Sequence, residues 1–553
     1  MKRGILIVIL GILCWVPVAT AQQNPGGAEK LGNVHFPVSC LPATQPQFDR
    51  AVAMLHSFWY PQGLNAFAEI AKTDPSCAMV YWGMAISRRA NPMVGAPGAG
   101  PDALKDAVEA VSKARLAGAK TQRERDYIAA IEMYYNDWEK RDYRTRVLAY
   151  EKAMEDVYLH YPEDPEAAVF YALAIDEAVN VLPPNPNFMR QQKAGAILEK
   201  VLAANPEHPG ALHYLIHAYD FPQLADRGLA AARQYGDVAP AAPHALHMPS
   251  HIYSMLGMWQ ESIKANQAAL SVSKGYAHAL DFMVYANLQM AQDIEAKRGV
   301  DQNIELLKSQ GAAGAAAANP TGAVLAGYTA LAAIPARYAI ERGAWTEAAG
   351  LEPVHSTPVA DSITYFARAM GSARSGNLDA ARKNIDQVKQ IEEGLLEVKD
   401  EYWAQQVQIQ RNAAAAWTAY AEGKKEAATK LMRTAANLED GSEKHVAMEN
   451  RLWPMRELLG DLLLEVNEPG LALKEYETSL QSARNRYRGF YGAAKAAQRS
   501  GDLEKARIYY GKLVALCSNA DTQRPELTEA KRYLAQTARL SATETPDGRV
   551  GLR

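Results

Sequence analysis

The stretch GDLEKA, Gly501–Ala506, decides the fold because its pattern of glycine, variable pair, acidic residue and small residue recurs along the chain. Matching phrases are GMWQES, GAWTEAA, GNLDAA and GKKEAA, which start at Gly257, Gly343, Gly376 and Gly423. In NEPGLA, Asn467 takes the place of the glycine, 34 residues before Gly501. Pro206 and Pro240 fall where a following helix would start, and they too are 34 residues apart. Self-similarity at this fixed period predicts a protein built from repeated supersecondary units.

The period, with its small, aromatic and proline positions, resembles the tetratricopeptide repeat family over most of residues 45 to 520. The resemblance implies an all-α fold, a right-handed α-solenoid of stacked helix-turn-helix units. A pair of short helices cannot bury its apolar face alone, so neighbouring pairs must stack and leave a concave surface. The phrases HPGALHYLIHAYD, PHALHMPSHIYSMLGMW and HALDFMVYANLQ look like those of exported bacterial tetratricopeptide proteins, which implies fold and location only.

The first residues have the pattern of a secretory signal peptide. Lys2 and Arg3 precede an apolar run from Ile5 to Val18, and Ala19-Thr20-Ala21 matches a small-x-small cleavage site. We therefore expect cleavage near Ala21 and an exported protein, periplasmic or secreted. No later segment has the roughly 18 to 20 apolar residues of a membrane span, so we expect no transmembrane segment in the mature chain.

Composition changes along the chain suggest its organisation. GAAGAAAANP, at 311–320, has the composition of a slack connection, and the polar sequence after about residue 540 that of a disordered tail. We expect a signal peptide at 1–21, an extended segment at 22–44, a first array with a histidine-lined groove at 45–295, a loose connection at 296–320, a second array at 321–540 and a disordered tail at 541–553.

Charge and cysteine content limit the partners and the compartment. A net charge of -3 and a pI near 6.5 give no global basic surface, so we expect no nucleic-acid partner. Tetratricopeptide grooves commonly hold extended peptides, which makes a protein or peptide the expected partner. Cys40 and Cys77 are close in sequence and could form a disulfide across the first helical hairpin. Cys517 would then be a buried lone thiol.

Half of the chain's 12 histidines lie between residues 213 and 278. They fall on three successive first helices in register with the 34-residue period, as His213, His217, His244, His247, His251 and His278. Residues three and four apart share a helix face, and packed helices lie about 8 to 10 Å apart. These imidazoles should therefore meet on one concave strip and could bind a transition metal, with zinc or copper suited to neutral imidazole.

Two further residues belong to this strip by their repeat positions. Asp281 could be a metal ligand, and Tyr285 a polar group of the ligand groove. His56 sits at another repeat position, and we expect it far from the cluster along the array. Pro249 lies inside a predicted first helix, where it removes a hydrogen bond to the carbonyl of Ala245. A functional site could explain why a proline stands inside this helix, although a tolerated kink would explain it too.

A basic set at a repeat junction is the second candidate site. Arg484, Arg486 and Arg488 could clamp a peptide carboxylate in the groove, or they could be a solvated face paired with nearby glutamates. We find no H-E-x-x-H motif, Walker loop or dinucleotide fingerprint in the sequence.

Two functions remain open at the level of sequence. The first is an exported scaffold that engages a protein or peptide and whose histidine-rich groove binds a metal ion or an acidic ligand. The second is a zinc or copper enzyme that uses the cluster between 213 and 281. The simplest alternative for the cluster is a set of hydrogen bonds between repeats.

Overall fold

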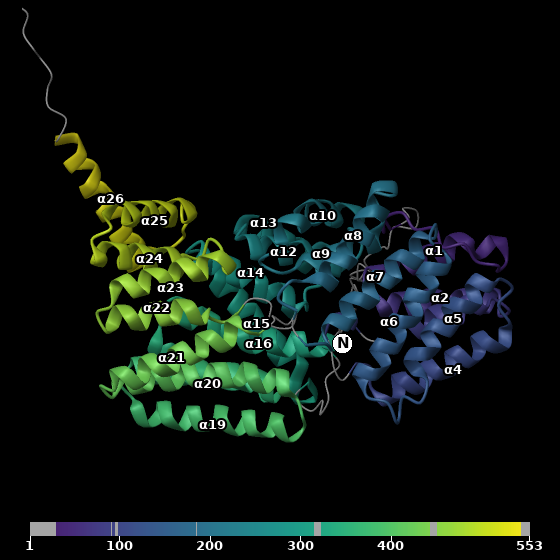
Figure 1. Ribbon diagram of the computed structural model, residues 1–553, viewed down its shortest axis with the longest axis horizontal. Coiled ribbons are helices and arrows are strands. Elements are labelled where there is room, and N and C mark those ends of the chain that lie inside the picture. Colours follow the sequence, from purple (N-terminus) through teal and green to yellow (C-terminus); the bar gives the residue numbers. More distant parts are fainter. Residues whose placement is uncertain are drawn as a thin grey trace, which may run out of the picture.

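The computed structural model describes residues 29–89, 91–94, 98–183, 185–314, 322–442 and 451–543. The predicted signal peptide at 1–21 lies outside these residues, as does the predicted tail beyond Thr543. Within the described residues the regular structure is helical (Figure 1). No helix among them combines the length and apolar character needed to cross a bilayer.

Helices of the first half follow one another at short intervals. They are η1 (Pro42–Thr44), α1 (Gln45–His56), α2 (Tyr60–Thr73), α3 (Ala78–Ser87), η2 (Pro92–Val94), α4 (Pro101–Ala117), α5 (Gln122–Tyr135), α6 (Tyr143–His160), α7 (Pro165–Val179), α8 (Met189–Ala204), α9 (Pro209–Tyr219), α10 (Ala225–Val238), α11 (Pro243–His247), α12 (Pro249–Leu256), α13 (Trp259–Val272), α14 (Ala277–Gln289) and α15 (Asp293–Gly314).

The second half continues in the same way. Its helices are α16 (Gly322–Glu341), α17 (Trp345–Ala349), α18 (Pro358–Arg374), α19 (Leu378–Glu397), α20 (Glu401–Ala421), α21 (Lys425–Asp440), α22 (Met455–Glu465), α23 (Pro469–Ser482), α24 (Tyr487–Ser500), α25 (Leu503–Leu516) and α26 (Pro525–Thr543).

Pairs of helices stack in the order of the sequence. Each helix packs on the next, and the first helix of a pair also packs on the first helix of the following pair, as α7 does on α9 and α18 on α20. First helices such as α9 and α14 are buried along almost their whole length, whereas second helices such as α10 and α21 bury one face. This is the predicted all-α solenoid of helix-turn-helix units.

The recurring glycines make the turns within the pairs. Gly257, Gly343, Gly376, Gly423 and Gly501 all have φ between 66° and 86°, the left-handed region that glycine adopts without steric cost. Asn467, which replaces a glycine in the repeat pattern, has φ 67°, and asparagine tolerates this region better than most residues. The same left-handed turn occurs at Ala291, 34 residues after Gly257.

The N-terminal segment crosses the first array instead of starting a repeat. Phe36 is fully buried against Phe48, Trp82 and Tyr127, with ring centroids 5.0 to 5.6 Å apart. Farther upstream, the amide of Asn33 donates to the carbonyl of Glu207, ahead of α9. A disulfide joins Cys40 to Cys77, whose Cα atoms are 4.9 Å apart. Cys517 is a buried free thiol whose pKa burial raises to about 12.

One expected boundary is wrong. The loose connection predicted at 296–320 is helical as far as Gly314, because α15 runs through most of it. α15 packs on α14 and α16 and continues the stack, whereas residues 315–320 of the predicted connection lie outside the described residues.

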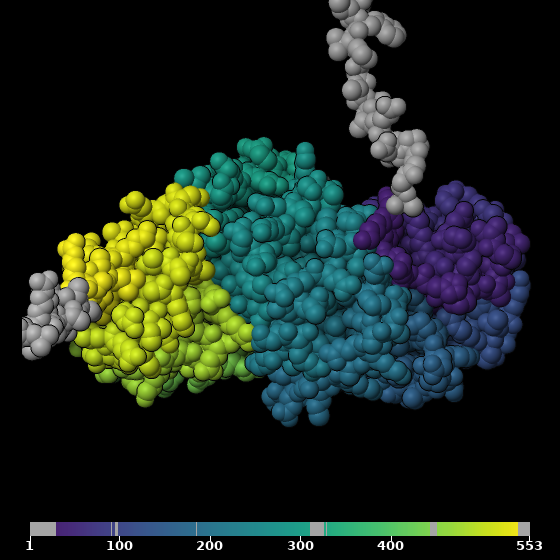
Figure 2. Space-filling view, turned by 90° about the horizontal axis from the view of Figure 1, so that it is seen from above, coloured from purple at the N-terminus to yellow at the C-terminus, as the bar shows by residue number. Residues whose placement is uncertain are grey.

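The C-terminal pairs fold back on the middle of the chain. The indole Nε1–H of Trp259 donates to the carbonyl of Asn485 at 2.7 Å, and α14 packs on α24. A Cβ at Gly257 would lie 2.5 Å from the carbonyl oxygen of Arg484, so glycine is required there for the contact as well as for the turn. In Figures 1 and 2 the yellow C-terminal helices lie directly against the teal helices of the middle.

A buried ionic network lies at this junction. Arg486, which has no solvent exposure, donates to Glu457 at 2.8 Å, to Glu341 at 2.6 Å and to the hydroxyl of Tyr285. Arg488 donates to the carbonyl of Glu341, and Arg484 pairs with Asp226 at 3.0 Å. The prediction that Tyr285 and these arginines line a ligand groove is therefore wrong for Arg486, which the returning C-terminal pairs bury, whereas Tyr285 and Arg484 line a cavity at this junction.

Glu457 gives this network a defined pH dependence. Burial raises the pKa of Glu457 to about 7 although Arg486 opposes the shift, while an unfolded glutamate titrates near about 4.3. Protonated Glu457 stabilises the folded state. This stabilisation is fully present below the unfolded pKa and is lost as the pH rises through the folded pKa of about 7. We expect the unfolding free energy of Glu457→Gln minus that of wild type to increase by about 2 to 3 kcal/mol when the pH is raised from 5 to 8. Urea unfolding at the two pH values measures this difference. The exposed Glu504→Gln is the control, and a pH-independent difference for Glu457→Gln would contradict the assignment.

Candidate metal centre

Pro249 divides the helix that carries three of the clustered histidines. α11 ends at His247 and α12 begins at Pro249, with Met248 still in a helical conformation between them. Proline is tolerated at the first position of a helix because its missing N–H has no intrahelical partner there. The irregularity predicted from sequence is therefore a junction of two short helices, and His247 and His251 flank it.

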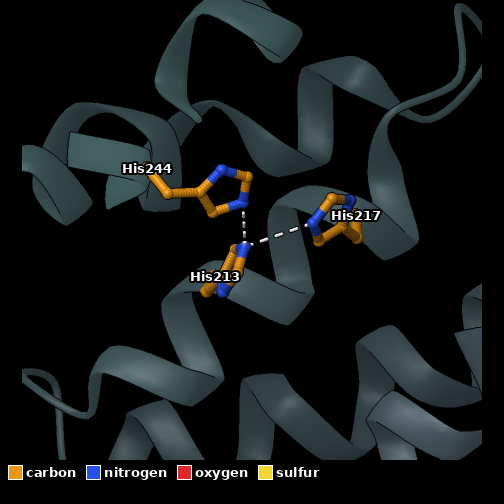
Figure 3. A group of neighbouring side chains, drawn as sticks. All are labelled: His213, His217 and His244. Atoms are coloured by element: carbon orange, nitrogen blue, oxygen red, sulfur yellow. Dashed lines mark hydrogen bonds between the residues drawn. The ribbon is translucent and has the colours of Figure 1, made fainter. Parts of the chain in front are cut away.

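The first group of histidines combines α9 and α11. Nε2 of His213 lies 3.1 Å from Nε2 of His217 and 3.1 Å from Nε2 of His244. Figure 3 shows the three rings pointing toward one another, with His213 and His217 on one helix and His244 on another segment. One nitrogen from each ring lies within 4.8 Å of the others. We call His213, His217 and His244 the first trio.

The second group repeats this arrangement one unit later. Nε2 of His247 lies 3.0 Å from Nε2 of His251, and His278 of α14 completes a group whose ligand atoms are again within 4.8 Å of one another. We call His247, His251 and His278 the second trio. Each trio takes two residues four apart from one repeat unit and one from the next unit, and adding 34 to each number of the first gives the second. The two are adjacent, since the ring centroids of His217 and His251 are 6.2 Å apart.

A phenylalanine covers each trio. The ring centroid of Phe58 lies 4.4, 5.8 and 5.4 Å from those of His213, His217 and His244. Phe282 lies 4.9, 4.9 and 5.0 Å from the three rings of the second trio. Phe58 has φ 51°, a left-handed conformation that costs a residue with a Cβ roughly 1 kcal/mol or more. The strained backbone of Phe58 thus places its ring against the three histidines.

Five of the six histidines are buried and His244 is partly exposed, so the predicted concave strip lies mostly inside the protein. His213, His247 and His251 have no solvent exposure, and His217 and His278 have less than one tenth. At the first trio, α1 packs on α9. Burial, reinforced by the neighbouring imidazoles, lowers the pKa of His213, His244 and His247 well below the ordinary histidine value. These rings are neutral at pH 7.

Hydrogen bonds at the far side of the rings fix where the protons are. Nδ1 of His213 lies 2.5 Å from the carbonyl oxygen of His56, and Nδ1 of His251 lies 2.8 Å from a carboxylate oxygen of Asp220. Both partners can only accept, so both Nδ1 atoms carry the proton. Nδ1 of His247 lies 2.6 Å from Oδ1 of Asn266, whose amide nitrogen donates to the carbonyl of Ser262. His247 therefore also carries its proton on Nδ1.

In the second trio two lone pairs face each other. With the proton on Nδ1, Nε2 of neutral His247 and Nε2 of neutral His251 are both acceptors and lie 3.0 Å apart, and Nε2 of neutral His213 is likewise an acceptor, 3.1 Å from Nε2 of His217 and of His244. A carboxylate, a carbonyl or an amide behind a histidine is the usual support of a metal-bound imidazole.

Asp281 does not join either trio, contrary to the prediction that it could be a ligand. Both of its carboxylate oxygens accept from Arg337, at 3.1 and 3.2 Å. The guanidinium reaches Asp281 from α16 and so binds it away from the histidines. Repeat position alone did not reveal this partner.

Sequence reasoning missed a third buried group and misplaced His56. Glu166 accepts from Nε2 of His56 at 2.8 Å and from Nε2 of His208 at 3.1 Å. The remaining ring nitrogens also have complementary partners, since Nδ1 of His56 faces the hydroxyl of Tyr214 and Nδ1 of His208 accepts from the amide of Ala211. His56 is next to the cluster, not far from it, because its carbonyl holds His213.

In this third group the charge and the hydrogen bonds are already balanced within the protein, as expected for a structural network. Although burial opposes it, His56 and His208 hold the pKa of the Glu166 carboxyl well below its usual range. Glu166 is therefore an anion that neutralises two donors, and each ring nitrogen is already engaged. The signal for it in sequence was only the presence of histidines at 56 and 208, 152 residues apart.

Comparison with known proteins gives a likeness of fold only. No family model matches the chain, and no curated protein matches its sequence. A chain of the Naa15/Naa10 complex bound to HypK-THB is 12% identical, covers 90% of this chain and 74% of its own length, and has a TM-score of 0.24. A tetratricopeptide repeat protein of Parabacteroides merdae is 10% identical over 75% of this chain and 99% of its own, with a TM-score of 0.23.

Human IFIT1, in its dimer with m7Gppp-AAAA, is 12% identical over 84% of this chain and 90% of its own, with a TM-score of 0.32. Likenesses at this level add nothing to the helix pairing that the chain shows by itself. From that pairing, the protein is an all-helical repeat protein of tetratricopeptide-like architecture.

Replacing Glu166 tests the third group. Glu166→Gln keeps the shape but turns one acceptor into a donor that faces an imidazole N–H. We expect a loss of about 3 kcal/mol of unfolding free energy, because a buried charged hydrogen bond is worth roughly 1.5 to 3 kcal/mol and the donors would clash. Urea unfolding in the presence of EDTA measures it. An unchanged midpoint would mean that the carboxylate does not bind both rings.

Proposed function

We propose that this protein is an exported, tetratricopeptide-like protein that binds two transition-metal ions, one in each histidine trio. The signal sequence supports export, and so does the Cys40–Cys77 disulfide, since disulfides persist in oxidising compartments. Metal binding is supported by six imidazoles that converge in two equivalent sets of three.

One observation carries the proposal: Nε2 of His247 and Nε2 of His251 are 3.0 Å apart while both Nδ1 atoms carry the protons. Two lone pairs at that distance repel unless a cation lies between them. Two nitrogens bound to one zinc ion at about 2.0 to 2.1 Å and a tetrahedral angle lie about 3.3 Å apart. The observed spacing is within a few tenths of an ångström of that value.

The donor set restricts the metal. Three neutral imidazoles without a thiolate suit zinc, copper or another borderline transition metal better than magnesium or calcium, which prefer oxygen. A site with three protein ligands also leaves a coordination position for a small molecule, whereas structural zinc sites are closed by four. The second function from the sequence, a zinc or copper enzyme, rests on that open position.

The competing arrangement uses a proton in place of a metal. His251 would be an imidazolium that pairs with Asp220 and donates from Nε2 to His247. Its cost is a charged ring in a fully buried place next to other imidazoles, and burial already lowers the pKa of His247. This arrangement predicts a protein that binds no metal.

Metal analysis of full-length protein, purified without a metal-affinity tag, separates the two arrangements. We expect two zinc or copper ions per chain by inductively coupled plasma mass spectrometry. His213→Ala/His217→Ala and His247→Ala/His251→Ala should each retain one, because each change removes two of the three ligands of one trio.

Two variants serve as controls for this measurement. The exposed His160→Ala and the buried Glu166→Gln should both keep two ions, the second because its histidines have no lone pair to offer. Metal-free wild type after reconstitution, with circular dichroism showing a folded chain, would instead establish the proton arrangement.

A second candidate function is the binding of a peptide or small molecule between the arrays. The observation that favours it is a cavity of about 790 Å³ between the middle and C-terminal helices, within the range of small-molecule sites. Arg451, Arg456 and Arg484 line it, each paired with an acid. Capture of the same partner from the exported fraction with and without chelator would support this scaffold function independently of the metal.

A further inference from the structure

A small cavity lies beside the first trio. Its volume is about 40 Å³, and the residues that bear on its chemistry are Asp176, Gln191, His217, Asp220 and Phe221. α7 contributes Asp176, and α8 contributes Gln191. His217 is a member of the first trio, and Asp220 supports His251 of the second. The cavity thus borders both halves of the proposed centre.

Two side chains in its wall have polar atoms without a protein partner. Among the described residues, neither carboxylate oxygen of Asp176 and neither amide atom of Gln191 makes a hydrogen bond. Asp176 is 5% exposed and Gln191 is 2% exposed. A buried polar group without a partner costs about 1 to 3 kcal/mol, so these two side chains would be selected against unless a ligand used them.

The size of the cavity limits what can bind. One water molecule needs about 10 to 15 Å³ by this measure, so the space holds a few water-sized groups at most. A peptide or a sugar is too large. A molecule of two or three heavy atoms that offers and accepts hydrogen bonds fits.

Phe221 connects this space with the larger one. It lines both the 40 Å³ cavity and the 790 Å³ cavity between the arrays, and its ring packs on Phe188 with centroids 5.2 Å apart. Phe221 therefore borders both the larger cavity and the small one next to His217.

We propose that the small cavity binds the exogenous ligand of the metal in the first trio, a molecule of two or three heavy atoms that coordinates through oxygen or nitrogen, such as a peroxide. Asp176 and Gln191 hydrogen-bond its outer atoms, and Phe221 lies on its route from the larger cavity. The inference rests on the proposed metal site and extends it by assigning which trio is open to ligand and which side chains select it.

The test uses copper(II)-loaded full-length protein and azide, a three-atom probe that gives a charge-transfer band when it binds copper. We expect one azide per chain. Asp176→Leu and Gln191→Leu should each weaken azide binding about tenfold or more while both copper ions remain. Gln410→Leu, a change of an equally buried glutamine on α20 with its own unpartnered oxygen, is the matched control and should leave azide affinity unchanged.

Variants that keep one trio assign the ligand to a metal. His247→Ala/His251→Ala, which leaves the first trio, should still bind azide, and His213→Ala/His217→Ala should not. Phe221→Ala should accelerate azide association.

The outcomes separate the two proposals. Two copper ions with unchanged azide affinity in both leucine variants would overturn the ligand site and leave the metal site standing, and so would azide bound only by the second trio. Failure of wild type to bind copper would overturn both. If Asp176→Leu does not fold, Gln191→Leu carries the test alone.

Discussion

A step of 34 residues along this chain is also a step of one helix pair in space, and the rest of the structure depends on that equivalence. First helices pack on first helices, so equivalent positions in successive units become neighbours. Two histidines one helical turn apart then lie beside a third from the next unit. Repeating the same three positions once more yields a second set next to the first. One packing rule thus produces two sites of nearly identical composition.

The parts of the molecule that follow from this rule were predictable from sequence. The turn glycines, the asparagine at 467, the burial of the lone thiol and the grouping of six histidines all follow from local pattern and period. What was missed depends on contacts between helices that are far apart in the sequence. α1 packs on α9, and no local pattern predicts that contact. The network of His56, Glu166 and His208 and the support of His213 by the carbonyl of His56 are consequences of it.

Closure of the C-terminal pairs was missed for a similar reason. Arg486 looked like a ligand-binding side chain because its partners, Glu341 and Tyr285, are 145 and 201 residues away. Asp281 looked available because Arg337 approaches from a different pair. Arg486 and Asp281 each pair with an opposite charge from a distant repeat, and the sequence does not show which residues of distant repeats are neighbours. Residues 296–314 of the predicted loose connection belong to α15, which packs on α14 and α16.

The contact of the C-terminal pairs with Gly257 and Trp259 also has a mechanical consequence. An open solenoid behaves like a spring, since each unit touches only its neighbours and the ends can move apart in many small steps. Here the bond from Trp259 to the carbonyl of Asn485 fastens two turns of that spring together, and the buried charges of Arg486 and its glutamates lie beneath it. Stretching the molecule therefore requires the contact between Trp259 and Asn485 to break first. Resistance to extension is then concentrated in this one contact and is not distributed over the repeats.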